Sequence, residues 1–328
     1  MTRFIVGRLA WTLAVVVAIT ILTFLIFFAA PGVDPAHQLA GRGATPAAVA
    51  TIKHDFGLDR SLPVRYALMM KHLVIDRDLT SYSQGRVKVL PQLVDAAPVT
   101  FSLVLGATLL WLVAGVLIGV LAASGRRLLD PLLMGAGLIA ISIPTFLLGD
   151  LLNLITQDRL HGFFLFSWIP PLGYVPFAQS PWGWFSHLVV PWITLSVAYV
   201  GIYSRVLRSK LQEVSEADFV RTARAKGLSP RRILVAHTLR NSLLTLVSIF
   251  GLDFAGLVAG GALVTEVVFG LPGIGALTFH AFQDLDLPVI MATVIYGAIF
   301  VVLANTAVDI LYAWLDPRTR SSGFDPAT

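Results

Sequence analysis

Six long runs of mostly apolar residues, with almost no charge, dominate the 328-residue sequence. They cover residues 9–30, 100–124, 131–149, 188–204, 243–265 and 288–315. A membrane-spanning helix needs roughly 20 such residues, which is close to the length of each run. Only 13% of the chain is charged, against roughly 25% in a typical soluble domain. The sequence therefore predicts an all-α membrane protein with six transmembrane helices.

Lysine and arginine are distributed unevenly between these runs. Arg3 and Arg8 precede the first run, and nine of the 24 basic residues lie between the fourth and fifth runs. Because short cytoplasmic loops carry an excess of Lys and Arg, both termini and the loop between helices 4 and 5 are predicted to be cytoplasmic. The external segment 31–99 is also basic, but it is longer than the roughly 60 residues to which the rule applies. The net charge of +5 thus reflects topology, and no nucleic-acid partner is needed to explain it.

The first run is predicted to be a helix that stays in the mature protein, because it is longer than the roughly 7 to 15 apolar residues of a signal peptide. The predicted organisation starts with an N-terminal helix at 1–30 and an external segment at 31–99. A core of five helices follows at 100–315, with a cytoplasmic loop at 209–242, and a cytoplasmic tail occupies 316–328. Such a chain is a multi-pass protein of the cytoplasmic membrane.

Motifs of several enzyme and carrier classes are absent from the sequence. It has no cysteine, no phosphate-binding loop, no H-E-x-x-H zinc motif and no G-x-S-x-G nucleophile elbow. Asp253 and Asp309 are the only ionisable residues predicted well within a span, whereas a proton-coupled carrier is expected to hold more. We therefore expect no enzyme activity and no bound metal or cofactor. Uphill transport would have to be driven by a partner protein.

Residues 213–243 have the pattern of a helix, a turn and a second helix. Ser215 is predicted to cap the first helix, Gly227 to end it with a positive φ, and Pro230 to begin the next. One face of the first helix is predicted to hold small residues between larger ones: Phe219, Thr222, Ala223 and Lys226. This face suits either the groove of a partner protein or, as in any basic loop, water and lipid headgroups.

This loop resembles the coupling loop, known as the EAA loop, of inner-membrane permeases of binding-protein-dependent ABC importers. The likeness is to the dipeptide/oligopeptide permease family (OppB/DppB type), in residues 218–229 and 237–242. Further motifs of that family are Pro31-Gly32, Phe56-Gly57-Leu58-Asp59, Ser142-Ile143-Pro144-Thr145-Phe146, and residues 265–269, 271–275 and 308–318. Two segments depart from the family pattern, residues 77–80 and an aromatic-rich insert at 159–187.

The resemblance implies a six-helix subunit that forms a heterodimer with a second, homologous permease. Two cytoplasmic ATPase subunits, which hold ATP and Mg²⁺, would dock beneath the pair, and an external substrate-binding lipoprotein would deliver the substrate. The residues implied to couple the permease to the ATPase are Phe219, Arg221, Thr222, Ala223, Arg224, Ala225, Lys226, Gly227, Leu228 and Ser229. Substrates of the family include dipeptides, oligopeptides, nickel chelates and glutathione, and the sequence does not choose among them.

Polar residues and glycines near the apolar runs supply candidates for the translocation path. Asp253, Ser142 and Asn305 either face this path or form hydrogen bonds within the helix bundle. Candidates for an outer gate, or else for a flexible connection, are Gly270, Pro272 and Gly273. Pro144 is predicted to kink the third helix, and the external segment is predicted to dock the binding protein. The alternative function is a stand-alone secondary carrier or channel.

Overall fold

The structure is a computed structural model that describes residues 2–28, 36, 45–55, 57–83, 87–124 and 128–315. This part of the chain is mostly helical, and its one pair of bridged extended residues is Thr80 and Lys88. The chain divides into two compact units. The first unit contains Met1–Thr100, Val258–Leu263 and Pro272–Leu303, and the second contains Phe101–Leu257, Val264–Leu271 and Ala304–Thr328.

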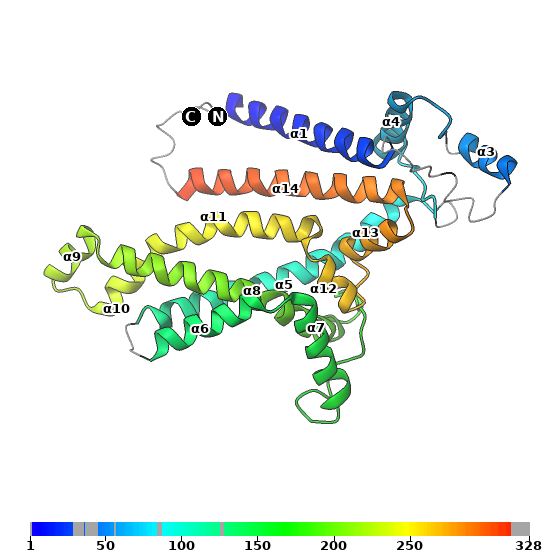
Figure 1. Cartoon of the computed structure of the whole chain (residues 1–328). Coiled ribbons are helices and arrows are strands. Elements are labelled where there is room, and N and C mark those ends of the chain that lie inside the picture. Colours follow the sequence, from blue (N-terminus) through cyan, green and yellow to red (C-terminus); the bar gives the residue numbers. More distant parts are fainter. Residues whose placement is uncertain are drawn as a thin grey trace. The chain divides into compact units, whose positions relative to one another are not determined.

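Figure 1 labels the α-helices of the two units along the chain. They are α1 Thr2–Phe28, α3 Pro46–Asp55, α4 Leu62–Met70, α5 Val89–Ala122, α6 Leu129–Ser142, α7 Thr145–Asn153, α8 Pro181–Ser215, α9 Asp218–Ala225, α10 Pro230–Ile233, α11 Arg240–Gly256, α12 Leu263–Val268, α13 Ile274–Gln283 and α14 Leu287–Leu315. Four π-helical turns continue some of these helices: η1 Lys71–Ile75, η2 Leu154–Arg159, η3 Leu234–Leu239 and η4 Leu257–Gly261.

Four helices of the described chain are each long and apolar enough to cross a membrane. They are α5, α8, the continuous helix Pro230–Gly261 and Leu287–Thr306 of α14. The pair Leu129–Ser142 and Thr145–Arg159 would form a fifth span, bent by 95°. The bend falls at Ile143, which is extended because the following proline disfavours helical geometry there. The third predicted run is therefore a broken pair of helices, and the six-span arrangement as a whole stays a prediction.

The first unit is built around an apolar core that joins α1, α4 and η1 to α5, α13 and α14. Its buried members include Phe24, Met69, Val89, Ile274 and Met291. The Phe24 ring lies edge-on to Tyr66 at 5.4 Å between centroids, and α1 and α4 also share a 2.6 Å hydrogen bond between the Thr20 and Tyr66 hydroxyls. Each such buried side chain contributes about 1.5–3 kcal/mol. The described part of segment 31–99, which is predicted to be external, therefore belongs to a folded unit, and α5 begins at Val89 rather than at residue 100.

A buried carboxylate, Asp286, joins residues 81–83 to the connection between α13 and α14 within the first unit. It accepts hydrogen bonds from the hydroxyls of Ser81 and Ser83 and from the N–H groups of Tyr82 (3.1 Å) and Ser83 (3.2 Å). A buried charge is costly unless it is hydrogen-bonded, and these four donors satisfy it. Asp286 therefore holds a loop of the external segment in one position.

In the second unit, glycines allow α5 and α8 to approach closely. A Cβ atom at Gly115 would lie 2.9 Å from the Cβ of Tyr203, and one at Gly119 would lie 3.0 Å from the Cβ of Leu207. Such distances are too short for larger residues, so these two glycines form a small-residue face for helix packing. α8 is thereby fixed against α5 in the part of the unit that precedes α9.

Candidate coupling element and translocation path

α9 is a short helix that follows α8 and precedes α10 at one end of the second unit (Figure 1). It begins at Asp218, whose negative charge in the first turn is favourable beside the positive end of the helix dipole. The residue before it, Ala217, is extended and offers no side-chain cap. The predicted cap at Ser215 is wrong, because Ser215 is the last residue of α8 and its hydroxyl donates to the carbonyl of Leu211.

The turn after α9 is a Schellman motif. Gly227 has φ = +76°, and its N–H donates to the carbonyl of Arg224 at 2.9 Å. The N–H of Leu228 donates to the carbonyl of Ala223 at 3.3 Å, which completes the motif. Pro230 then occupies the first position of α10, where its missing N–H costs nothing. The predicted glycine turn and proline start are both confirmed.

One side of α9 is buried inside the hairpin that α9 forms with α10. Val220 is fully buried and Ala223 is only 5% exposed, and both pack with Ile233 and the half-buried Leu228. An apolar contact across the glycine is the usual companion of a Schellman turn. The prediction that Ala223 shares an exposed face with Phe219 is therefore corrected. Ala223 supports the helix from within the hairpin.

The rest of α9 and the turn after it expose an aromatic ring and several basic residues. Phe219 is 46% exposed. The other exposed coupling candidates are Arg221, Thr222, Arg224, Ala225, Lys226, Gly227 and Ser229. Arg221 lies 3.5 Å from Asp218, but both side chains are well exposed, and such pairs contribute about 0–1 kcal/mol. An exposed ring on a helix that also carries exposed basic residues is suited to a partner with an acidic groove.

Two anchored helices carry this hairpin. α10 continues through η3 into α11, so the second arm is the start of one 32-residue helix. The first arm follows α8, where Arg208 binds both carboxylate oxygens of Asp130 on α6, with 2.9 Å between Nε and Oδ1. Bidentate pairs of this kind restrict geometry as well as adding energy. The position of α9 is therefore tied to that of the membrane helices on either side.

The three path candidates are not joined to one another. Asp253 on α11 accepts a 2.9 Å hydrogen bond from the hydroxyl of Tyr203 on α8. Such a hydrogen bond within the helix bundle was the predicted alternative to a position in the translocation path. Ser142 is exposed and donates to the carbonyl of Leu138 in its own helix. Asn305 is half-buried on α14, and within the described chain no hydrogen bond links it to the other two. A role in the path stays a prediction for all three.

The gate candidates lie in the turn between α12 and α13. Gly270 has φ = +61°, Pro272 is exposed, and Gly273 precedes α13 with an extended backbone. The apolar residues beside them are at most 2% exposed: Phe269, Leu271 and Ile274. Such packing favours an ordered turn over a flexible connection. A gating role for this turn stays a prediction.

Two family models together match most of the sequence. The model described as binding-protein-dependent transport system inner membrane component matches residues 115–321, and the model of the N-terminal part of this membrane component matches residues 1–104. The chain belongs to this family. It is therefore a permease, and a multi-pass protein of the inner membrane.

Relatives cover the permease over nearly its whole length. A putative peptide transport system permease protein of Brucella abortus (strain 2308) is 36% identical over 326 residues, 98% of this chain and 99% of the relative. A probable D,D-dipeptide transport system permease protein of Escherichia coli (strain K12) is 35% identical over 97% of this chain and 98% of its own. The solved inward-facing MetNI methionine ABC transporter matches in fold, with a TM-score of 0.55 at 19% identity over 69% of this chain and 97% of that chain. The helical permease fold is confirmed.

Two acidic residues of the permease lie on helices but were not included in the predicted apolar runs. Asp150 lies exposed on α7, although the third predicted run ends just before it. Glu266 lies on α12 and is fully buried, although it falls between the fifth and sixth predicted runs. Both predicted runs end one residue before these charges, so neither run includes them. Asp309, whose side chain was expected within the last span, lies outside the described side chains.

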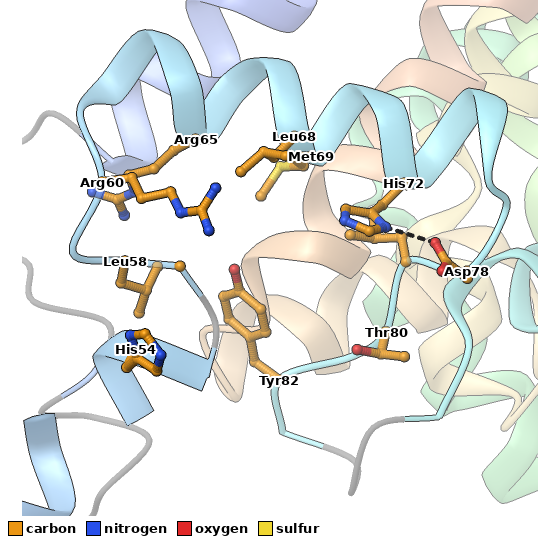
Figure 2. Close-up of a pocket in the computed structure, with 12 residues that line it drawn as sticks. His54, Leu58, Arg60, Arg65, Leu68, Met69, His72, Asp78, Thr80 and Tyr82 are labelled. Carbon is orange, nitrogen blue, oxygen red and sulfur yellow. Dashed lines mark hydrogen bonds and ion pairs between the residues drawn. The ribbon is translucent and has the colours of Figure 1, made fainter. Parts of the chain in front are cut away.

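One group of side chains in the described part of the permease has the spacing of metal ligands. Ligand atoms of His72, Asp76 and Asp78 lie within 4.8 Å of one another. His72 Nδ1 is 2.7 Å from Asp78 Oδ1, and Lys71 Nζ is 3.4 Å from Asp76 Oδ2. The hydrogen bond from His72 lowers the pKa of Asp78, so this carboxylate stays ionised and paired. Contacts within the chain thus already involve all three of these side chains, and Figure 2 shows the one between His72 and Asp78.

Proposed function

We propose that this permease moves short peptides into the cytoplasm as one subunit of an ABC importer that is driven by ATP hydrolysis in partner subunits. The observation that carries the proposal is the α9–α10 hairpin, which presents Phe219 and its basic neighbours beyond the ends of two long helices. Its loop is the most basic in the chain, so the positive-inside rule puts the hairpin in the cytoplasm. The names of the relatives, which refer to peptide and dipeptide transport, support the substrate class.

The partner subunits are inferred from the absence of an ATP-binding motif in the sequence and from the family of the chain. Since the sequence has no phosphate-binding loop, ATP and Mg²⁺ would be held by two ATPase subunits. A second, homologous permease would complete the translocation path as a heterodimer. An external binding lipoprotein would deliver the peptide to the pair. The permease itself would bind no cofactor and would catalyse no reaction.

In this proposal α9 converts closure of the ATPase pair into movement of membrane helices. Phe219 would enter a groove of the ATPase, and the surrounding basic groups would meet acidic residues there. Val220 and Ala223 hold α9 against Ile233 of α10, so a displacement of α9 is passed directly to the helix that α10 begins. Movement of a rigid helix between two states is a common form of allosteric switching.

The test is transport by the whole complex in proteoliposomes, with uptake of a labelled dipeptide and ATP hydrolysis measured together. Phe219→Ala is expected to leave the permease folded and to lower uptake at least fivefold, because the ring is exposed in the free chain. Phe282→Ala on α13, where the ring is 59% exposed, is the matched control and should transport normally. Gly227→Pro removes both the required φ and the N–H donor, and should abolish coupling. Uptake that proceeds without ATPase subunits would refute the proposal.

A further inference from the structure

A pocket of about 450 Å³ lies between α6 and α8, entirely within the second unit. It is lined by Asp130, Pro131 and Met134 of α6 and by Arg205, Arg208 and Ser209 of α8. The two helices lie side by side (Figure 1), and a Cβ atom at Gly201 would lie 2.5 Å from the carbonyl oxygen of Gly137. This close packing sets the spacing of the two walls. Neither the coupling candidates nor the path candidates line the pocket.

The polar part of the pocket contains one positive charge that is not paired. Arg208 binds both carboxylate oxygens of Asp130, so these two charges satisfy each other. The side chain of Arg205 is exposed, and it forms no hydrogen bond or ion pair with any residue in the part of the chain that the structure describes. Ser209 is also exposed and lies one turn further along the same side of α8. A guanidinium group beside a hydroxyl is suited to a phosphate.

The other part of the pocket is apolar and continues along α6. Met134 lines the pocket, and Leu138 and Ile141 follow it on the same face of the helix. Leu138 is 53% exposed and Ile141 is 37% exposed. On α8, the exposed Ile202 lies one turn before the unpaired arginine. A free phosphate ion would leave this apolar surface unused, whereas a molecule that joins a phosphate to a long apolar chain would contact both parts.

The pocket lies where two apolar runs meet their first charged residues. The run 131–149 begins directly after Asp130, and the run 188–204 ends directly before Arg205. Lipid headgroups lie at this boundary, and basic side chains there attract anionic headgroups. The positive-inside rule predicts that this end of α8 is cytoplasmic, on the side of the membrane where the leaflet carries negative charge. The position therefore favours a lipid over a soluble phosphate.

We propose that this pocket binds one anionic phospholipid, with its phosphate at Arg205 and Ser209 and an acyl chain along Met134, Leu138 and Ile141. The lipid would bridge α6 and α8 just before the chain reaches the coupling hairpin. The proposal needs only the position of the permease in the membrane and does not depend on its substrate. A neighbouring protein subunit is the other possible occupant, and the experiment has to separate it from a lipid.

The experiment measures photolabelling of α6 in the whole complex, reconstituted in nanodiscs of phosphatidylcholine. The probes are phosphatidylglycerol and phosphatidylcholine with the same diazirine on one acyl chain, and peptide mass spectrometry locates the labelled residues. Labelling of residues 131–141 is expected to be about fivefold stronger with phosphatidylglycerol, the factor that corresponds to about 1 kcal/mol for one basic group. Arg205→Gln should remove this preference, and Arg205→Lys should retain most of it. Arg232→Gln is the matched control, because Arg232 is an exposed arginine of the same basic loop but does not line the pocket.

Equal labelling by the two probes, or a preference that survives Arg205→Gln, would overturn the assignment. So would loss of the preference in millimolar glycerol phosphate, because the pocket would then take a phosphate without acyl chains. Absence of label at residues 131–141 with both probes would show that a protein subunit covers the pocket instead. Unchanged thermal unfolding of Arg205→Gln excludes misfolding as the cause of a lost preference. Because no transport is measured, a failure here leaves the proposed import function intact.

Discussion

Substitution of Gly227 provides a graded test of the coupling hairpin. With φ = +76°, this residue adopts a left-handed conformation that costs other L-residues about 1–2 kcal/mol. A Cβ atom at this position would meet nothing within 4 Å, so no steric clash adds to that cost. One to two kcal/mol corresponds to a factor of roughly 5 to 30 in the population of the Schellman turn. If only the closed turn docks, the affinity of the permease for the ATPase falls by up to that factor.

The series Gly227→Asn, Gly227→Ala and Gly227→Val orders these costs. Asn visits the left-handed region most readily, and a β-branched residue is a clear outlier there. Affinity of the reconstituted permease pair for its ATPase is therefore expected to fall in the order Gly, Asn, Ala, Val, and uptake per ATP hydrolysed should follow it. Gly135→Ala on α6 is the matched control, because a Cβ atom there also meets nothing and the backbone is helical.

Wild-type affinity in both Gly227→Ala and Gly227→Val would refute the reasoning, since the left-handed turn would then be unnecessary for docking. So would a loss in Gly227→Asn that exceeds the loss in Gly227→Val, because that order contradicts the backbone cost. A loss of affinity in Gly135→Ala of the same size would show that any added methyl group disturbs the complex.

Three further predictions concern packing and protonation. Asp286→Ala, which leaves four donors without their acceptor, should destabilise the first unit by about 2–4 kcal/mol and speed hydrogen exchange at residues 81–83. Because the pKa of Tyr82 is raised from about 10 to about 12, its contribution to the free energy of unfolding is full below pH 10 and is lost as the pH rises through 12. Denaturant titrations from pH 9 to pH 12 should show a smaller loss in Tyr82→Phe, and an equal loss would contradict the shift. Arg208→Ala should destabilise the complex by about 1–2 kcal/mol, and adding Asp130→Ala should cost little more in thermal unfolding, since the two side chains mainly satisfy each other.

Local chemistry explains the parts of the fold that the sequence predicted well. Apolar runs mark membrane helices because lipid leaves no alternative for the backbone, and Gly227 and Pro230 end and begin helices through their own dihedral restrictions. The break after Ser142 was predicted only as a kink, because the effect of Pro144 on its neighbour is local but the size of the bend depends on packing.

Features that depend on distant residues were not predictable. Ala223 is buried by Ile233, which belongs to the other arm of the hairpin, so helical periodicity alone placed it on the wrong face. The residues that donate hydrogen bonds to Asp286 lie more than 200 residues earlier in the chain. Thr100 is also distant from its partner, since its hydroxyl accepts a hydrogen bond at 2.8 Å from the N–H of Ile274, 174 residues later. Such pairs follow from tertiary structure, and one sequence holds no signal for them.

The helix Pro230–Gly261 carries the coupling turn at one end and, at the other, Gly260 with φ = +123°, near the point where the chain leaves the second unit for the first. Its 32 residues extend over roughly 48 Å at 1.5 Å per residue. A twist applied at α10 is therefore passed along α11 within the second unit as a rotation of one helical backbone, with no relay of side chains. Each residue of a helix advances by about 100°, so deleting one residue from α11 would turn the end of α11 by that angle relative to the hairpin. The permease would then keep both ends of the helix, but the rotational orientation of one end relative to the other would change.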